Sequence, residues 1–313
     1  MIGIQDIRQA AERIAPHIHH TPIMTSRTIN AMFGAEIFFK CENLQKVGAF
    51  KARGAVNAVM QLDEKTARCG VITHSSGNHA QALAYAAGLR GIACTIIMPD
   101  TAPAVKVAAV RGYGAEIIFC KPTQESRLRT MEEVAQRTGA HVVPPYDDDR
   151  IMAGQGTAGL ELCEEVEGLD LVMAPVGGGG LMGGVATAVR ATQPTAMIIG
   201  AEPVIAADAK MSLQTGLLQP PTDRLTIADG LRTGLSEKTF AQLRSMGVEI
   251  ETATEDSIRR GTLLVMSRMK LVIEPSAGVT LGVLLEQPGL ARGRRIGIIL
   301  CGGNVDLGSL VFG

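Results

Sequence analysis

The chain has 313 residues, of which 46% are hydrophobic and 19% charged, with a formal net charge of −1 and a mean hydropathy of +0.18. These values are typical of a well-packed globular protein, and the length suffices for two lobes. Charges of both signs are interspersed, which excludes a basic surface for nucleic acid and a polybasic face for membranes. Small neutral or zwitterionic ligands fit this composition better.

The N-terminal residues 1–8 contain an aspartate and lack a basic stretch followed by an apolar one, so they do not resemble a signal peptide. No uncharged apolar run approaches the length of a bilayer-spanning helix. The six cysteines show neither a C-x-x-C pair nor the spacing of a disulfide framework, which favours reduced thiols. We therefore expect a cytoplasmic protein that binds neither nucleic acid nor membrane.

Short apolar runs alternate with helix-like segments through most of the chain. The predicted strands are residues 37–39, 70–73, 94–98, 116–119, 141–143, 171–176, 197–201 and 296–300. Nearly continuous β-branched runs with helices between them are typical of parallel strands buried on both faces. The sequence therefore predicts a doubly wound α/β fold with parallel-rich sheets covered by helices.

The predicted strands between residues 70 and 143 form a compact series, sufficient for a small lobe. Residues 144–149 contain two prolines and three aspartates, which disfavour regular structure and predict a linker. We therefore divide the chain into a small domain, residues 70–147, and a discontinuous large domain, residues 1–69 and 148–313.

Lys51 lies among mostly apolar or small residues, 48–55, just before a helical pattern. A lysine becomes able to form a Schiff base when burial or positive surroundings lower its pKa. Taken alone, such a lysine is more often a solvated residue at the start of a helix. The rest of the sequence is needed to choose between these interpretations.

Residues 75–79, Ser-Ser-Gly-Asn-His, follow the second predicted strand and precede a helical pattern. Amides and hydroxyls at a helix start can bind an anion, and those of Ser75 to His79 suit a substrate carboxylate. Serine and asparagine are also ordinary helix caps, so this stretch alone leaves both interpretations open.

Four consecutive glycines, Gly177 to Gly180, separate the predicted strand 171–176 from the next helix. Backbone without side chains lets amides converge on an anion, and the helix dipole adds positive potential, so we predict a phosphate site. The segment also fits the G-x-G-x-x-G pattern of dinucleotide-binding folds, with Glu202 where a ribose-binding acid would lie. A nicotinamide-dependent dehydrogenase is therefore an alternative.

Several stretches together resemble the fold-type II pyridoxal phosphate enzymes, in particular the serine/threonine dehydratase and serine racemase group. The matching stretches are residues 40–55, 75–79, 153–157, 177–184, 273–278 and 301–306. They span nearly the whole chain in the expected order. The resemblance implies a two-lobed fold like that of the tryptophan synthase β subunit.

The resemblance implies that Lys51 carries pyridoxal 5′-phosphate as a Schiff base and later acts as a general base. The other implied cofactor contacts are Phe50 beside the ring, Asn78 at the ring hydroxyl, Cys301 at the pyridine nitrogen, Glu274, and the backbone of Gly177, Gly178, Gly179, Gly180 and Leu181 at the phosphate. A thiol at the pyridine nitrogen does not enforce ring protonation, which suits elimination better than transamination.

The substrate-binding residues that the resemblance implies are Ser75, Ser76, Gly77, Asn78, His79 and Arg127. Ser76 matches the serine thought to reprotonate Cα in serine racemases, which makes it a second catalytic candidate. Arg127 matches a position that can reach the distal group of a substrate such as 3-hydroxyaspartate, although an arginine in a surface salt bridge is the alternative. Ala49 replaces the usual serine before Phe-Lys and so removes a hydroxyl near Lys51.

Residues 202–208 resemble the metal loop of the racemases. Glu202 and Asp208 would supply carboxylates and Ala206 a carbonyl oxygen to Mg²⁺ or another divalent cation, with water completing the coordination. Two acids six residues apart are otherwise usually just solvated. This assignment takes Glu202 away from the ribose contact that a dehydrogenase needs.

The sequence thus predicts a pyridoxal phosphate-dependent L-threonine/L-serine dehydratase, an ammonia-lyase that forms a 2-oxo acid and ammonia by β-elimination. Serine racemase and L-threo-3-hydroxyaspartate ammonia-lyase are alternatives within the same family. An NAD-dependent dehydrogenase and a non-catalytic binding protein are alternatives of other classes. A homodimer is expected from the resemblance and from base rates.

Overall fold

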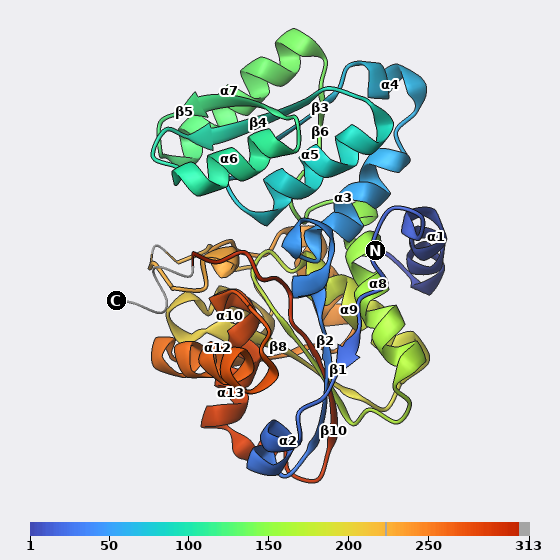
Figure 1. Ribbon diagram of the computed structural model, residues 1–313, viewed down its shortest axis with the longest axis vertical. Coiled ribbons are helices and arrows are strands. Elements are labelled where there is room, and N and C mark those ends of the chain that lie inside the picture. The colour runs from blue at the N-terminus through green and yellow to red at the C-terminus, as the bar shows by residue number, and fades with distance from the viewer. Residues whose placement is uncertain (223, 307–313) are drawn as a thin grey trace.

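The computed structural model describes residues 1–222 and 224–306. The strands are β1 (Ile23–Met24), β2 (Glu36–Lys40), β3 (Val71–His74), β4 (Cys94–Pro99), β5 (Glu116–Cys120), β6 (His141–Val142), β7 (Leu171–Pro175), β8 (Met197–Pro203), β9 (Glu249–Ala253) and β10 (Arg295–Ile299). They form two separate sheets, which lie in the two lobes of Figure 1.

The helices connect and cover these strands. The α-helices are α1 (Ile4–Ile14), α2 (Arg27–Phe33), α3 (Lys51–Met60), α4 (Glu64–Arg68), α5 (Asn78–Arg90), α6 (Ala104–Gly112), α7 (Gln124–Thr138), α8 (Asp149–Glu165), α9 (Gly180–Thr192), α10 (Asp208–Thr215), α11 (Glu237–Ser245), α12 (Glu255–Met269) and α13 (Pro275–Glu286). Short 3-10 helices are η1 (Glu42–Leu44), η2 (Lys46–Gly48), η3 (Val204–Ala206), η4 (Asp229–Leu231) and η5 (Pro288–Leu290). Among the described residues, no helix has the length and apolarity needed to cross a bilayer.

The larger sheet has the strand order β1-β2-β10-β7-β8-β9, and the smaller one has the order β5-β4-β3-β6. Only β1 pairs antiparallel with its neighbour; the other pairs within the described sheets are parallel. The central strand β7 is buried along its whole length, as its apolar sequence predicts for a sheet covered on both faces. The predicted α/β fold with parallel-rich sheets is confirmed.

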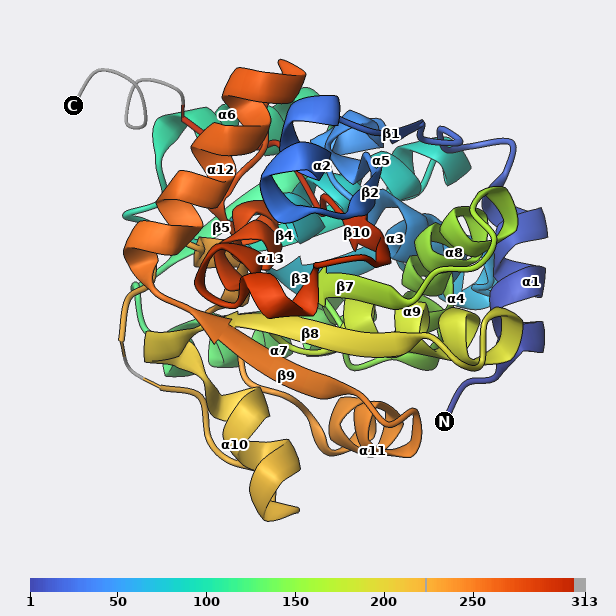
Figure 2. The ribbon, with the colours of Figure 1, turned by 90° about the horizontal axis from the view of Figure 1, so that it is seen from below.

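Two predicted features of the strands differ from the structure. The sequence analysis missed β1, which has only two residues, and β9, whose sequence Glu-Ile-Glu-Thr-Ala carries two acids. Strand β9 lies at the edge of the larger sheet, where Glu249 is exposed and tolerated. Figure 2 shows β9 beside β8 at this edge.

Helix α3 packs against both lobes. Its apolar residues Ala55, Val56 and Val59 are buried in the same core as strand residues of the smaller sheet, although the predicted small domain starts only at residue 70. On its other side α3 approaches α8 closely, because a Cβ on Gly154 would lie only 2.6 Å from the Cα of Gly54. The division into residues 70–147 and the remainder stays a prediction, with α3 shared between the two lobes.

A buried ionic cluster fixes α3 to the larger lobe. The guanidinium of Arg53, which is fully buried, donates hydrogen bonds of 2.7 Å to Glu42 and of 2.6 Å to Glu161 of α8. Lys40 donates to the same Glu161 at 2.6 Å. Charge-assisted bonds to two carboxylates satisfy the buried guanidinium and hold its helix in place.

Candidate active site

The predicted site residues gather where the carboxyl ends of strands from both sheets meet the start of α3. Lys51 is the first residue of α3, and Asn78 is the first residue of α5, shortly after β3. The glycine run follows β7, and Cys301 follows β10. In parallel α/β sheets this end of the strands is where ligands bind.

Lys51 extends its amine into the space between the lobes. The Nζ atom donates a 2.7 Å hydrogen bond to the carbonyl of Pro145 and lies 5.0 Å from the centroid of the Phe50 ring. Burial lowers the pKa of Lys51 to about 8, although the nearby Cys301 and Glu274 act in the opposite direction. A lysine with this pKa is partly neutral near pH 8 and is therefore a competent nucleophile and base.

Glu274, Asn78 and Asn304 form a hydrogen-bonded group next to Lys51. The amide nitrogen of Asn78 donates to both carboxylate oxygens of Glu274, at 3.1 and 3.0 Å, and its oxygen accepts a 3.0 Å bond from Asn304. The Cys301 Sγ lies 3.9 Å from Glu274. Burial raises the pKa of Glu274 to about 7 and raises that of Cys301 well above its usual range, so Cys301 is a neutral thiol.

The glycine run fits the predicted phosphate cradle. The amides of Gly177 to Leu181 are buried, yet they donate to no carbonyl or side chain within the described residues. Side chains are excluded here: a Cβ on Gly178 would overlap the ring of Tyr146, and Gly179 has a φ of +83°. Converging buried donors without partners at the start of α9 are what a phosphate group requires.

The Ser75–His79 stretch is half-buried, apart from the buried His79, and faces the same space. The Nε2 of His79 lies 2.9 Å from the carbonyl of Val143, so Nε2 carries the proton and Nδ1, which is buried without a partner in the described structure, is an acceptor. Burial, with a smaller contribution from the charge of Lys51, lowers the pKa of His79 to about 3. His79 is therefore neutral, while Ser75 accepts a 3.3 Å bond from the Gly77 amide.

Arg127 differs from the surface arginine that the alternative interpretation described. Its Nε is buried without a hydrogen-bond partner, and the guanidinium makes no ion pair with any acid in the described part of the chain. Its charge, together with burial, lowers the pKa of His74, the residue before Ser75. An unpaired buried cation beside the substrate-binding stretch is suited to bind an anion.

The predicted metal loop brings two buried carboxylates together. Glu202 accepts hydrogen bonds from the amides of Ala209 and Lys210, at 3.1 and 2.9 Å, and Asp208 has one buried oxygen without a partner. Burial raises the pKa of Glu202 to about 8 and that of Asp208 to about 6. Within residues 1–222 and 224–306, no three acidic, histidine or cysteine side chains form a metal cluster, so a cation here needs backbone or water ligands as well.

Ala206 ends η3, two residues before Asp208. Its carbonyl is the third oxygen that the sequence analysis assigned to the cation, and no structural observation tests that assignment. The donor set of two carboxylates and an orphaned oxygen nevertheless suits a hard divalent ion such as Mg²⁺. The carboxylate of Glu202 is held by backbone amides of α10, which leaves it poorly placed for a ribose.

Two residues of the predicted linker belong to the site. The carbonyl of Pro145 holds Lys51, and the ring of Tyr146 lies against Gly178 and Gly180. The sequence analysis missed both because it considered only the linker composition of residues 144–149. The only available signal was an aromatic residue within a segment otherwise made of prolines and acids.

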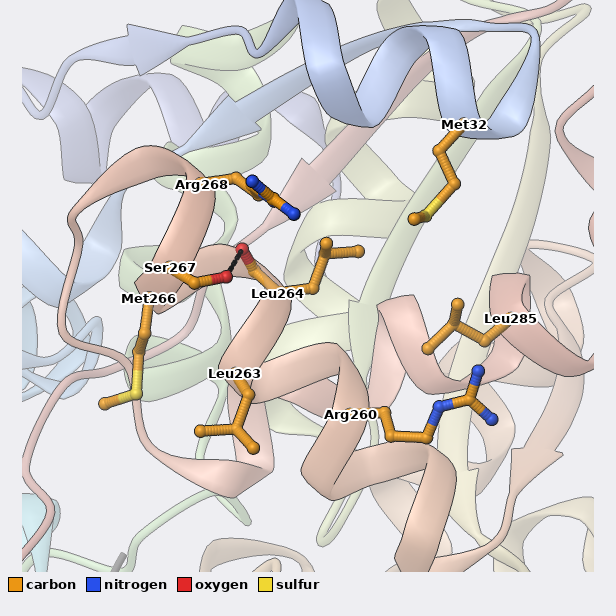
Figure 3. A pocket seen from close by; sticks show the side chains of 8 residues that line it. All are labelled: Met32, Arg260, Leu263, Leu264, Met266, Ser267, Arg268 and Leu285. Carbon is orange, nitrogen blue, oxygen red and sulfur yellow. Dashed lines mark hydrogen bonds between the residues drawn. The ribbon is translucent and has the colours of Figure 1, made fainter. Parts of the chain in front are cut away.

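A surface groove at α12 lies apart from these residues and contains none of them. Its lining comes from α2, α12 and α13 and consists of Met32, Arg260, Leu263, Leu264, Met266, Ser267, Arg268 and Leu285. Figure 3 shows that Ser267 bonds back to the Leu264 carbonyl of its own helix. This apolar and cationic groove offers no group suited to the chemistry considered above.

The chain belongs to the fold-type II family of pyridoxal phosphate enzymes, because the family model described as "Pyridoxal-phosphate dependent enzyme" matches residues 14–302. The predicted family is thus confirmed, and the nicotinamide-dependent alternative is disfavoured.

Similar proteins differ in the reaction that their names describe. The beta-hydroxyaspartate dehydratase of Paracoccus denitrificans is 46% identical, with 98% of this chain and 97% of that protein covered. The serine racemase structure from Dictyostelium discoideum has a TM-score of 0.93 at 44% identity, with 98% of this chain and 99% of that chain covered. A bacterial-type relative, the threonine deaminase structure from T.th., has a TM-score of 0.92 at 40% identity, with the same two shares covered.

Proposed function

We propose that this enzyme is an ammonia-lyase for β-hydroxy amino acids and that 3-hydroxyaspartate is its preferred substrate. The observation that carries the proposal is the unpaired, buried Nε of Arg127 near the Ser75–His79 stretch. A dicarboxylic substrate supplies the distal anion that this arginine lacks. L-Serine and L-threonine, the substrates first predicted from the sequence, would undergo the same reaction without that ion pair.

The likeness to a beta-hydroxyaspartate dehydratase at 46% identity supports this choice. The likeness to a threonine deaminase structure, at 40% identity, supports ammonia-lyase chemistry in general. Serine racemisation is the second candidate, because Ser76 is retained beside the cofactor space and a serine racemase is 44% identical. The Mg²⁺ site, the homodimer and the cytoplasmic location remain predictions.

Pyridoxal phosphate would be held by Lys51, by the backbone of the glycine run and by Asn78, and it supplies an electron sink for the bonding pair released at Cα. The amine of Lys51, whose pKa is about 8, takes the Cα proton. The carbonyl of Pro145 accepts a hydrogen bond from this amine and fixes its direction. Loss of the β-hydroxyl as water and hydrolysis of the enamine product give the 2-oxo acid and ammonia.

The small lobe would orient the substrate. Hydroxyls and amides of Ser75 to His79 would bind the α-carboxylate at the start of α5, where the helix dipole favours an anion. Arg127 would bind the β-carboxylate, which places the β-hydroxyl between the two anchors. His79 stays neutral and so adds no second cation to this pocket.

The test compares 2-oxo acid formation from L-threo-3-hydroxyaspartate, L-serine and L-threonine by the purified holoenzyme. In Arg127→Met we expect kcat/KM for hydroxyaspartate to fall about tenfold to a hundredfold, the value of a charge-assisted bond of about 1.5–3 kcal/mol. The value for L-serine should change little. Equal losses for both substrates would overturn the role of Arg127, and no turnover of any of the three would overturn the ammonia-lyase. Formation of D-serine in the same reactions measures the second candidate.

A further inference from the structure

One ion pair joins the two lobes outside the predicted cofactor and substrate contacts. The Nζ of Lys106 donates to Oδ2 of Asp229 at 2.8 Å. Lys106 lies on α6, which is anchored by Val110 in the core that includes the smaller sheet. Asp229 begins η4, and its neighbours Ala228 and Leu231 are buried in the core of the larger sheet. The pair therefore connects elements that belong to different cores.

The short helix η4 also forms part of the wall of the candidate active site. The amide of Gly230 donates to Ser276 at 3.1 Å, and the Gly230 carbonyl would lie 3.0 Å from a Cβ on Gly177 of the phosphate cradle. Asp229 raises the pKa of Glu274, and Lys106 lowers it, so both charges lie near this site residue. The ion pair is thus at the rim of the site, between the cradle and α6.

We propose that Lys106 and Asp229 are positioning residues whose ion pair holds the small lobe against the phosphate cradle and so retains the substrate. This inference rests on the proposed function, because the retained molecule is the substrate of that reaction. The side chains are 34% and 45% exposed. An exposed pair adds little to folding stability, so it can break and re-form each time substrate enters or product leaves.

A purely structural role for the pair is poorly supported, because other groups already fulfil that role. The buried Arg53 cluster fixes α3 to the larger lobe with several short bonds. Apart from Asn78 with Glu274 and Asn304, the Lys106–Asp229 pair is the polar side-chain contact that crosses between α5–α6 and the C-terminal half of the described chain. Asn78 and Glu274 are themselves predicted cofactor contacts, so only the Lys106–Asp229 pair, among these described contacts, can be removed without touching the chemistry.

The kinetic test uses the holoenzymes of Lys106→Met, Asp229→Asn and the double variant. We expect the KM for L-threo-3-hydroxyaspartate to rise about two- to fivefold in each single variant, with kcat unchanged. The double variant should show no further rise, because a pair is lost only once. Added salt should raise KM in the wild type and have a smaller effect in the variants. Glu36→Gln, which removes an exposed pair with Arg295 within one sheet, is the matched control and should leave KM unchanged.

A second readout does not need turnover. Hydrogen exchange of residues 104–112 and 229–231 in the holoenzyme should be faster in the three variants than in the wild type or in Glu36→Gln. Faster exchange without turnover of any β-hydroxy amino acid would overturn the proposed function but support the ion pair as a lobe contact. Unchanged KM and exchange, or effects of the two substitutions that add, would overturn the inference. A higher KM in Lys106→Met with a lower KM in Asp229→Asn would also overturn it, since Lys106 would then bind substrate itself.

Discussion

The two halves of the candidate active site are built from different parts of the polypeptide. On the larger lobe, the phosphate cradle consists of backbone amides between buried glycines, and a Cβ on Gly178 would overlap Tyr146. On the smaller lobe, side chains face the space, and polar atoms of His79 and Arg127 are buried without partners in the described structure. Backbone geometry recognises the group that every member of the family shares, while side chains that await a partner determine which substrate is chosen.

The largest expected effect removes the residue on which the cofactor half depends. Lys51→Ala should lose the Schiff-base absorbance band and lower kcat by at least about 10²- to 10⁴-fold, the usual value of a general base. Absorbance spectra and steady-state rates measure these two losses. If the band persisted in the variant, another lysine would carry the cofactor and the assignment of this half would be wrong.

A smaller effect tests whether the cradle needs bare backbone. Gly178→Ala places a methyl group into the Tyr146 ring, and we expect the free energy of unfolding to fall by about 1–3 kcal/mol with weaker cofactor binding. Denaturant unfolding and titration with pyridoxal phosphate measure both changes. The control is Gly88→Ala, on α5, where an added Cβ meets nothing within 4 Å and should stabilise by about 0.5–1 kcal/mol. Equal behaviour of the two variants would contradict a close-fitting cradle.

The smallest effect concerns the carboxylates behind the cradle. With chelator present, stability should fall as pH rises from about 5 to 8, because the folded state keeps protons on Asp208 and Glu202, whose pKa values are raised to about 6 and 8. Mg²⁺ at ten times its Kd should add about 1.4 kcal/mol near pH 8 and flatten this decline. Thermal unfolding with chelator and with Mg²⁺ measures the difference, since the raised pKa of Glu274 contributes equally to both curves.

Asp208→Asn is the control for this measurement, because it removes the carboxylate with the unpaired oxygen. The variant should respond to Mg²⁺ less than the wild type and should keep its preference among substrates. Identical unfolding curves with and without Mg²⁺ across this pH range would contradict a cation site at Glu202 and Asp208.

Sequence was most informative where a single residue type is physically required. Four glycines before a helix, and a lysine in an apolar stretch, indicate chemistry that few other residues allow, and the structure brings Lys51 and the cradle into one space. The stretch Ser75 to His79 was ambiguous alone, because a helix cap and an anion site use the same residues. Family likeness, more than local pattern, resolved it.

Features that depend on distant packing were not predictable. Strand β9 was missed because Glu249 and Glu251 give it a polar sequence that only an edge position tolerates. Pro145 and Tyr146 were assigned to a linker, since no local pattern shows that they meet Lys51 and Gly178. The unpaired state of the Arg127 Nε is likewise visible only once its surroundings are known.

The close crossing of α3 and α8 at Gly54 and Gly154 gives the molecule a natural fulcrum. Lys51 stands only one turn from that crossing, whereas Arg127 is carried on α7, far out on the other arm of the lever. Any rocking of the small lobe about this fulcrum would sweep the arginine through a wide arc and leave the lysine almost still. Substrates could then be exchanged without disturbing the bond that tethers the cofactor.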